Sequence, residues 1–583
     1  MEVRHGLGYQ NYDKMMENNI FYIDKTDFIR EWWECADEVT LITRPRRFGK
    51  TLNMSTVECF FSIKYKDRRE LFEGRKVWEH KELRTIQGTF PVIFMSFASV
   101  KSGRHSETCN EAKVGNISEL TEAIKKVIAD TYNEYAFIME KDIYTKNERE
   151  HFGTVNDDMS DTTMYTAINR LCHYLEKYYG KKVIVLLDEY DTPMQEAWAK
   201  GFWDEAVEVF RNFFGSTFKT NKSLCRGLIT GITRISKESI FSDLNHLKVV
   251  TTTSNEYAKC FGFTEEEVFE ALDGSGLGEH KEGVKKWYDG FIFGNHADIY
   301  NPWSIVSFIK SMGRYEAYWA NTSSNSLVSA LIRTSNIEAK KTVEDLLDEK
   351  SFQAPIDEQI VFSQLEGNIN AVWSLLVASG YLKIIDSEPL TADRKGKPQC
   401  TMKLTNTEVL NVFEDMIRSW FAVDVAGSVY NDFVKAMLLD DVEFMNEFMN
   451  EIALNSFSSF DAAKNAASED HPERFYHGFV LGLIVGLRDR FEITSNRESG
   501  FGRYDVVLNP RDRERDNAYI IEFKVFRASR ERTLKDTVAT ALAQIEEKQY
   551  ENSLITNGIP KEKIRKYGFA FQGKKCLIGT VYH

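Results

Sequence analysis

Near the C-terminus, two carboxylates and a lysine are spaced so that they can form a metal-dependent hydrolytic site. Asp505 leads into one apolar run, and the next run, residues 519–524, contains Glu522 and Lys524. Residues two apart in a strand point to the same face, and a hairpin would bring Asp505 to that face too. Two carboxylates with open water positions suit Mg²⁺, and a neighbouring lysine can orient or deprotonate the attacking water. This is chemistry suited to phosphodiester hydrolysis.

The spacing resembles the PD-(D/E)xK nuclease superfamily, in the variant that many bacterial proteins fuse to an AAA-ATPase-like domain. The Gly-Arg lead before Asp505 and a later helix with Gln544 fit this resemblance. Such nucleases often use an upstream glutamate to complete the metal shell, and Glu473 and Glu498 are the alternatives. The resemblance implies Mg²⁺, with Mn²⁺ as an alternative, and DNA in preference to RNA. The competing interpretation is an ordinary β-hairpin with solvated charges.

A second group of residues has the spacing of a phosphate-binding loop. The apolar run 41–43 leads into Arg-Pro-Arg-Arg-Phe-Gly-Lys-Thr at 44–51, and a helical pattern follows. In such a loop the helix N-terminus cradles phosphates, the lysine reaches the β and γ groups, and the threonine hydroxyl binds Mg²⁺. Lys50 and Thr51 would take these roles, and the rest of the predicted ATP site is Arg46, Arg47, Phe48 and Gly49. Arg44 replaces the usual first glycine, as in the arginine-rich loop of AAA-ATPase-like proteins.

The acidic partner of this loop is expected at the end of another strand. After Lys182, residues 183–187 form an unbroken apolar run that ends in Asp188 and Glu189, the pattern of a buried parallel strand. Ligands of open α/β sheets bind at the carboxyl ends of strands, so Asp188 and the Lys50 loop should converge. Asp188 would hold Mg²⁺, and Glu189 would polarise the attacking water.

Two further strands are predicted in the same sheet, at 90–97 and 227–234. By analogy with AAA and STAND-type ATPases, the second takes the sensor-1 position. Thr230 or Thr233 would then sense the γ-phosphate, and Arg234 would stabilise charge. A threonine in a strand is also explained by β-propensity alone, which is the alternative.

Composition indicates a globular protein of several domains. The chain has 583 residues, of which 43% are hydrophobic and 13% aromatic. The first residues lack the apolar core of a signal peptide, and no stretch has the roughly 20 apolar residues of a membrane span. The eight cysteines form no C-x-x-C pair, which argues against a disulfide framework and a zinc site. We therefore expect a cytoplasmic protein that does not enter a membrane.

Charge is distributed unevenly along the chain. The formal net charge is −14, but residues 471–583 contain 20 Lys and Arg against 15 Asp and Glu. The C-terminal part is thus +5 and the remainder −19. A basic C-terminal module favours attraction of phosphates to that end of the chain alone.

These patterns predict an α/β protein of four parts. A P-loop domain with a parallel sheet at 1–250 would precede a helical lid at 251–330. A helical and winged-helix-like region would follow at 331–465, with a linker at 456–471. A restriction-endonuclease-like α/β domain would occupy 466–583.

The predicted function is an ATP-binding and ATP-hydrolysing protein whose nucleotide state regulates a C-terminal Mg²⁺-dependent DNA nuclease. The alternative is an ATP-dependent signalling or scaffold switch whose C-terminal domain holds nucleic acid without cutting it. A third alternative is ATP-driven remodelling by a ring, which would make the protein an oligomer. These roles rest on analogy of fold.

Overall fold

The computed structural model describes most of the chain. The described residues are 4–100, 115–234, 240–241, 244–319, 328, 331–332, 337–357, 365, 368–388, 397–421, 429–450, 482, 486–495, 498–499, 502–503, 506–526, 531–572 and 575–581. The predicted linker at 456–471 lies outside them. Across the described helices, none combines the length and apolar character needed to cross a membrane.

The chain forms two compact units. The first comprises Met1–Ser323 and Gln353–Val409, and the second comprises Ser324–Phe352 and Leu410–His583. The first unit thus contains residues 251–323 of the predicted lid and residues 353–409 of the predicted helical and winged-helix-like region. Each unit is described by itself below.

A five-stranded parallel sheet organises the first unit. Its order is β2-β3-β4-β1-β5. The strands are β1 (Val39–Thr43), β2 (Val92–Ser96), β3 (Val183–Asp188), β4 (Leu224–Gly231) and β5 (Leu247–Val250). Every residue of β1 and β3 is buried, as expected for strands covered on both faces. The four predicted strands are confirmed, and β4 separates β1 from β3.

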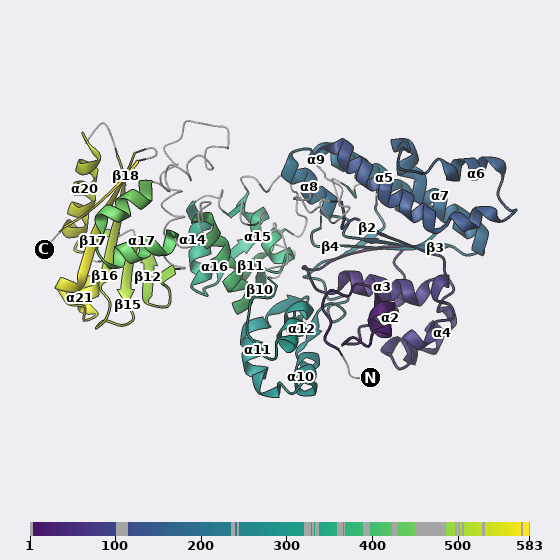
Figure 1. The fold of residues 1–583 in the computed structure, drawn as a ribbon, viewed down its shortest axis with the longest axis horizontal. Helices are drawn as coiled ribbons and strands as arrows, with labels where there is room; N and C mark the ends of the chain where they lie inside the picture. The colour runs from purple at the N-terminus through teal and green to yellow at the C-terminus, as the bar shows by residue number, and fades with distance from the viewer. Residues whose placement is uncertain are drawn as a thin grey trace. The chain divides into compact units, whose positions relative to one another are not determined.

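Helices cover both faces of this sheet (Figure 1). Helix α3 (Lys50–Phe61) packs on one face against β2, β3 and β4, whereas α5 (Ile117–Glu134) and α7 (Asp161–Tyr179) contact β2 and β3 from the other. Helix α9 (Trp203–Phe214) packs beside α5 and α7. The shorter helices are α1 (Tyr12–Glu17), α2 (Asp27–Glu34), α4 (Lys81–Ile86), α6 (Lys146–Gly153) and α8 (Thr192–Lys200).

Two smaller layers complete the first unit. The first is a sheet of order β6-β8-β7 with three helices; its elements are β6 (Phe263–Thr264), α10 (Glu265–Gly274), α11 (Lys281–Tyr288), β7 (Phe291–Phe293), β8 (His296–Tyr300) and α12 (Pro302–Lys310). The second is a sheet of order β10-β11-β9 with one helix; its elements are β9 (Phe352–Pro355), α15 (Ile369–Ala378), β10 (Leu382–Ser387) and β11 (Gln399–Leu404). In the predicted winged-helix-like region, helix α15 is followed by a turn at Gly380, where φ is 84°, and by the antiparallel pair β10-β11.

A mixed five-stranded sheet forms the core of the second unit. Its order is β12-β15-β16-β17-β18, and only the β16-β17 pair is parallel. The strands are β12 (Phe491–Ser495), β15 (Val506–Pro510), β16 (Ala518–Val525), β17 (Ile564–Gln572) and β18 (Lys575–Thr580). Helix α20 (Leu534–Glu547) makes the crossover between the parallel strands and packs on β16, β17 and β18. The α/β fold class is therefore confirmed in both units.

Further helices and strands lie in the second half of the chain. They are α14 (Ile337–Leu347), α16 (Thr407–Phe421), α17 (Val429–Leu438), β13 (Glu498–Ser499), β14 (Gly502–Arg503) and α21 (Asn552–Thr556). A described helical stretch at 442–450 also contacts the free edge of β18. Its Asn446 side chain donates to the carbonyl of Ile578 at 2.9 Å and accepts from the Ile578 N–H at 2.7 Å. The Asn446 amide thus satisfies backbone groups that an edge strand would expose.

Candidate nucleotide and nuclease sites

The P-loop connects β1 to α3 and positions its lysine at a helix N-terminus. Gly49 is the N-cap of α3 and has φ of 79°, a left-handed conformation that glycine adopts without steric cost. Lys50 is therefore the first residue of the helix, where free N–H groups favour an anion. This is the local geometry predicted for phosphate binding.

Lys50 is buried beneath its own loop, with 8% of its surface exposed. Its Nζ donates to the carbonyl oxygens of Arg44 at 2.9 Å and Pro45 at 2.8 Å. Burial lowers the pKa of the ammonium, while the carboxylates of Glu189 and Asp188 oppose this shift. The loop thus holds a desolvated cation that could exchange its carbonyl partners for phosphate oxygens.

Asp188 connects three elements at the carboxyl edge of the sheet. Thr51 in α3 donates from Oγ1 to Asp188 Oδ2 at 2.6 Å. Thr230 in β4 donates to the other carboxylate oxygen, Oδ1. The structure therefore brings Thr51 and Asp188 together at the carboxyl edge of the sheet, as predicted.

Glu189 follows Asp188 in a strained backbone conformation. Its φ of 53° is uncommon for a residue with a side chain, and such strain is concentrated at functional sites. Burial and the neighbouring Asp188 carboxylate raise the pKa of Glu189. Its Oε2 accepts from the Thr192 hydroxyl at 3.2 Å. Glu189 is thus a desolvated carboxylate beside the P-loop.

The arginines of the loop have structural partners. Arg44 is fully buried, donates from Nη1 to the Thr43 carbonyl at 3.0 Å and lies over the ring of Phe293 at 4.8 Å from its centroid. Burial lowers the pKa of Arg44 to about 10. Arg47 lies over the ring of Trp303 in α12, 4.2 Å from its centroid. These contacts join the P-loop to the β6-β8-β7 sheet, through Phe293 of β7, and to helix α12, through Trp303.

The other predicted loop residues are also anchored. The backbone carbonyl of Arg46 accepts from Asn301 Nδ2 at 3.2 Å and Trp319 Nε1 at 3.3 Å. Phe48 is buried and packs edge-on against Phe291, with ring centroids 4.8 Å apart. These contacts were not predictable from the loop, because their partners lie more than 200 residues away.

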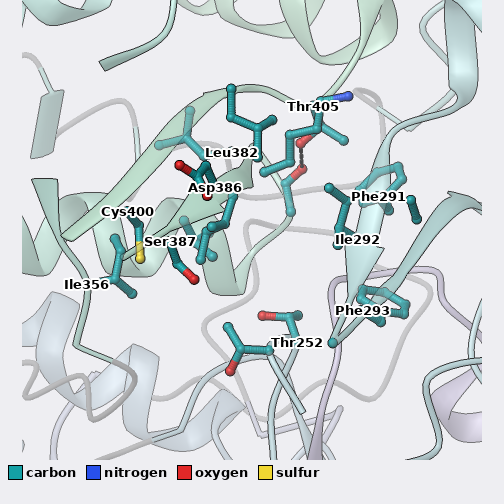
Figure 2. Close-up of a pocket in the computed structure, with 18 of the residues that line it drawn as sticks. Thr252, Phe291, Ile292, Phe293, Ile356, Leu382, Asp386, Ser387, Cys400 and Thr405 are labelled. Carbon is teal, nitrogen blue, oxygen red and sulfur yellow. Dashed lines mark hydrogen bonds between the residues drawn. The ribbon is translucent and has the colours of Figure 1, made fainter. Parts of the chain in front are cut away.

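A cavity of about 400 Å³ lies beside the P-loop within the first unit. Figure 2 shows Phe291 and Phe293 of β7 opposite Leu382 and Asp386 of β10, with Thr252 below them. Pro45 of the loop also lines this cavity. Its lining mixes polar and apolar side chains, and neither Asp188 nor Glu189 is among the residues that line it.

The predicted sensor threonines are already engaged by acids. Thr230 donates to Asp188, and Thr233 donates from Oγ1 to Asp191 at 2.9 Å. Arg234 follows directly and is half-buried. The sequence pattern did not single out Asp191, although it lies only three residues after Asp188.

In the second unit, Glu522, Lys524 and Gln544 form a connected polar cluster. Lys524 Nζ donates to Glu522 Oε1 at 3.2 Å and to Gln544 Oε1 at 2.6 Å. Gln544 Nε2 donates in turn to Glu522 Oε1 and, at 3.1 Å, to the Tyr550 hydroxyl. The Glu and Lys share one face of β16, as their spacing predicted, and α20 supplies the glutamine.

The other predicted metal ligands of this unit fall outside the described part or have no described side chain. Asp505 and Glu473 lie outside the described residues, and Glu498 begins β13. Val506, the residue after Asp505, pairs with Ile521, the residue before Glu522. The predicted hairpin of these two runs is thus formed by β15 and β16.

Two separate parts of the chain match families of known proteins. Residues 6–241 match a family described as predicted AAA-ATPase, and residues 471–581 match the PD-(D/E)XK nuclease superfamily. An uncharacterized protein from the vnfD 5′ region of Azotobacter chroococcum mcd 1 is 23% identical over 594 residues, with 99% of this chain and 98% of that protein covered. The Walker-type ATPase PABY2304 of Pyrococcus abyssi is 14% identical with a TM-score of 0.33, over 70% of this chain and 99% of that one.

Proposed function

We propose that this protein hydrolyses ATP and cuts DNA. The proposal rests on the combination of an AAA-ATPase-like domain at 6–241 with a PD-(D/E)XK nuclease superfamily domain at 471–581. The observation that carries the ATP assignment is the contact between Thr51 and Asp188 at the end of the P-loop. It joins a loop hydroxyl to a strand-end carboxylate that lies 137 residues further along the chain. We expect the protein to act in the cytoplasm, because both of its proposed substrates, ATP and DNA, are available there.

The residues at this edge of the sheet fit Mg²⁺. Thr51 and Asp188 offer a hydroxyl and a carboxylate oxygen 2.6 Å apart, and Mg²⁺ prefers such hard oxygen ligands. When bound, the ion would neutralise charge on the transferred phosphoryl group. Thr230 would fix the orientation of the Asp188 carboxylate through its second oxygen.

The protein groups then have distinct roles in hydrolysis. Lys50 would leave the carbonyls of Arg44 and Pro45 and donate to the β and γ phosphates. Glu189 would orient the attacking water and accept its proton, because its raised pKa makes it a stronger base than an exposed glutamate. We propose that Arg46, Arg47 and Arg234 contact the phosphates of ATP. Phe48 and Gly49 would belong to the loop of the same site.

For the nuclease, we propose that Asp505 and Glu522 bind Mg²⁺, or Mn²⁺, and that Lys524 orients the attacking water. Support comes from the register of β15 and β16, which pairs the neighbours of the two acids, Val506 and Ile521. Gln544 would hold both Glu522 and Lys524 in place. Glu473 or Glu498 would complete the metal shell, and DNA is expected as the substrate in preference to RNA.

We further propose that nucleotide state regulates cutting. The P-loop makes contacts to the following layer through Arg47 and Trp303 and through the Arg46 carbonyl and Trp319. A loop that rearranges around phosphate would therefore move groups outside the nucleotide site. These contacts favour a regulated ATPase over a P-loop that acts in isolation.

The activities are tested with the full-length protein. Plasmid, linear and single-stranded DNA and RNA are incubated with Mg²⁺ or Mn²⁺, with and without ATP, while released phosphate is measured in parallel. We expect ATP turnover and cleavage of DNA, with cleavage lost in both Asp505→Asn and Glu522→Gln. Cleavage that persists undiminished in these variants would refute the nuclease assignment and indicate contamination. DNA binding without cleavage in wild type would favour the non-cleaving switch.

A further inference from the structure

Asp191 links the turn after β3 to the end of β4. Its Oδ2 accepts from the backbone N–H of Ile232 at 3.0 Å, the N–H of Thr233 at 2.9 Å and the Thr233 hydroxyl at 2.9 Å. Gln195 Nε2 also donates to this oxygen, at 3.1 Å. One carboxylate oxygen thus gathers four donors, three of them from the segment that follows β4.

The other carboxylate oxygen of Asp191 is buried without a described hydrogen-bond partner, and the residue is 1% exposed. It lies against Gly231, since a Cβ built on that glycine would come within 2.7 Å of Asp191 Oδ1. A buried, incompletely paired carboxylate costs stability, and such a group in a folded protein calls for a reason.

Helix capping does not supply that reason. Asp191 occupies the N-cap position of α8, where an aspartate usually accepts from the helix's own N–H groups. Its side chain makes no such cap bond. The carboxylate is instead turned toward the segment after β4.

Tyr190, which lies between Glu189 and Asp191, also attaches the turn after β3 to Thr233. The Tyr190 hydroxyl donates to the Thr233 carbonyl at 2.7 Å, so Tyr190 and Asp191 both attach the turn to Thr233. Glu189, directly before them, has the strained φ of 53°. Strain of this kind persists only where the surrounding structure holds it in place.

We propose that Asp191 is a positioning residue that holds Glu189 in its reactive orientation, with Thr233 as its partner. This inference rests on the proposed ATP hydrolysis. Thr233 would then act on Glu189 indirectly, because its hydroxyl donates to Asp191. A displacement of the segment after β4 would move Asp191 and, with it, the turn that contains Glu189. Thr230 acts in parallel on Asp188.

The test uses the full chain with Asp191→Asn, Thr233→Val and Thr233→Ser. Asp273→Asn is the matched control, because Asp273 is exposed on α10, where it pairs with Lys281 of α11. Single-turnover ATP hydrolysis and the dissociation constant of a fluorescent ATP analogue are measured with Mg²⁺. Hydrogen exchange of the amides at 189–192 and 232–233 is measured without nucleotide.

We expect Asp191→Asn to slow hydrolysis about tenfold or more while the dissociation constant changes less than about threefold, because a positioning residue acts on the chemical step. Thr233→Val should lower the rate of hydrolysis less, and Thr233→Ser should keep the wild-type rate.

A wild-type rate in Asp191→Asn, or equal losses of rate and affinity, would overturn the inference. Wild-type protein without ATP turnover would refute the proposed function instead. Exchange would then decide the inference: faster exchange at 189–192 in Asp191→Asn than in Asp273→Asn supports it, and equal exchange overturns it.

Discussion

The nucleotide site and the nuclease-like site are built from carboxylates in different ways. At the first, Asp188 receives donors from α3 and β4, and Glu189 adopts a strained φ of 53°. At the second, Glu522 and Lys524 lie two residues apart on a regular strand, and Gln544 of the next helix joins them. The first arrangement depends on strand order, whereas the second depends on local spacing and one helix crossover. The nucleotide site should therefore be more sensitive to changes in packing around it.

The largest expected effect is at the nuclease-like site. Glu522→Gln should lower DNA cleavage by about a thousandfold, since it removes one charge from the proposed metal ligands. Lys535→Ala is the matched control, because Lys535 is exposed on α20. Cleavage rates are measured on plasmid at saturating Mg²⁺. ATP turnover should be unchanged in both variants, and a loss of ATP turnover in Glu522→Gln would contradict the separation of the two sites.

A smaller loss is expected at Thr51. Thr51→Val removes the hydroxyl that donates to Asp188, and ATP turnover should fall about a hundredfold because a proposed Mg²⁺ ligand is lost. Thr51→Ser keeps the hydroxyl and should retain most of the turnover. Phosphate release across a range of Mg²⁺ concentrations measures the effect. Equal turnover in the two variants would show that the hydroxyl is not used.

Packing at the end of β4 tests the sensitivity of the nucleotide site. In Gly231→Ala the new Cβ would meet the Tyr190 ring at 2.6 Å and Asp191 at 2.7 Å, so overpacking should destabilise the first unit by about 1–3 kcal/mol. Gly215→Ala, where a Cβ meets nothing within 4 Å, should be nearly neutral. Urea unfolding followed by fluorescence measures both. Similar unfolding midpoints would mean that the close approach is relieved without cost.

A second effect on stability concerns a buried carboxylate in the first unit. Glu408 accepts from the Ser304 hydroxyl at 2.8 Å and the Trp319 N–H at 2.8 Å, and burial raises its pKa from 4.5 to about 7. Because the folded state binds this proton more tightly, its stabilisation is complete below about pH 4.5 and is lost as pH rises to about 7. Across this range wild type should lose on the order of 1–3 kcal/mol from this group.

Glu408→Gln removes this titration, so its melting temperature should decline less than that of wild type between about pH 5 and pH 7.5. Glu270→Gln, at an exposed position of α10, is the control and should follow wild type. Parallel pH profiles for wild type and Glu408→Gln would contradict the assigned shift.

Much of this arrangement was predictable from sequence because its signals are local. Runs of apolar residues predicted β1, β3 and β16, and the i, i+2 spacing predicted that Glu522 and Lys524 share a face. The partners of the P-loop arginines were not predictable, since Arg47 reaches Trp303 only through tertiary packing. The engagement of Thr230 by Asp188 likewise follows from the position of β4 between β1 and β3, which no local pattern specifies.

The central claim is that the nucleotide site controls cutting by the same chain. The most direct measurement is the rate of plasmid cleavage against ATP concentration for wild type and Lys50→Ala, with Lys64→Ala, an exposed lysine paired with Glu134, as the control. We predict that the wild-type and Lys64→Ala rates change with ATP, whereas the Lys50→Ala rate stays constant. If Lys50→Ala cleaved as fast as wild type at every ATP concentration, regulation by nucleotide would be contradicted.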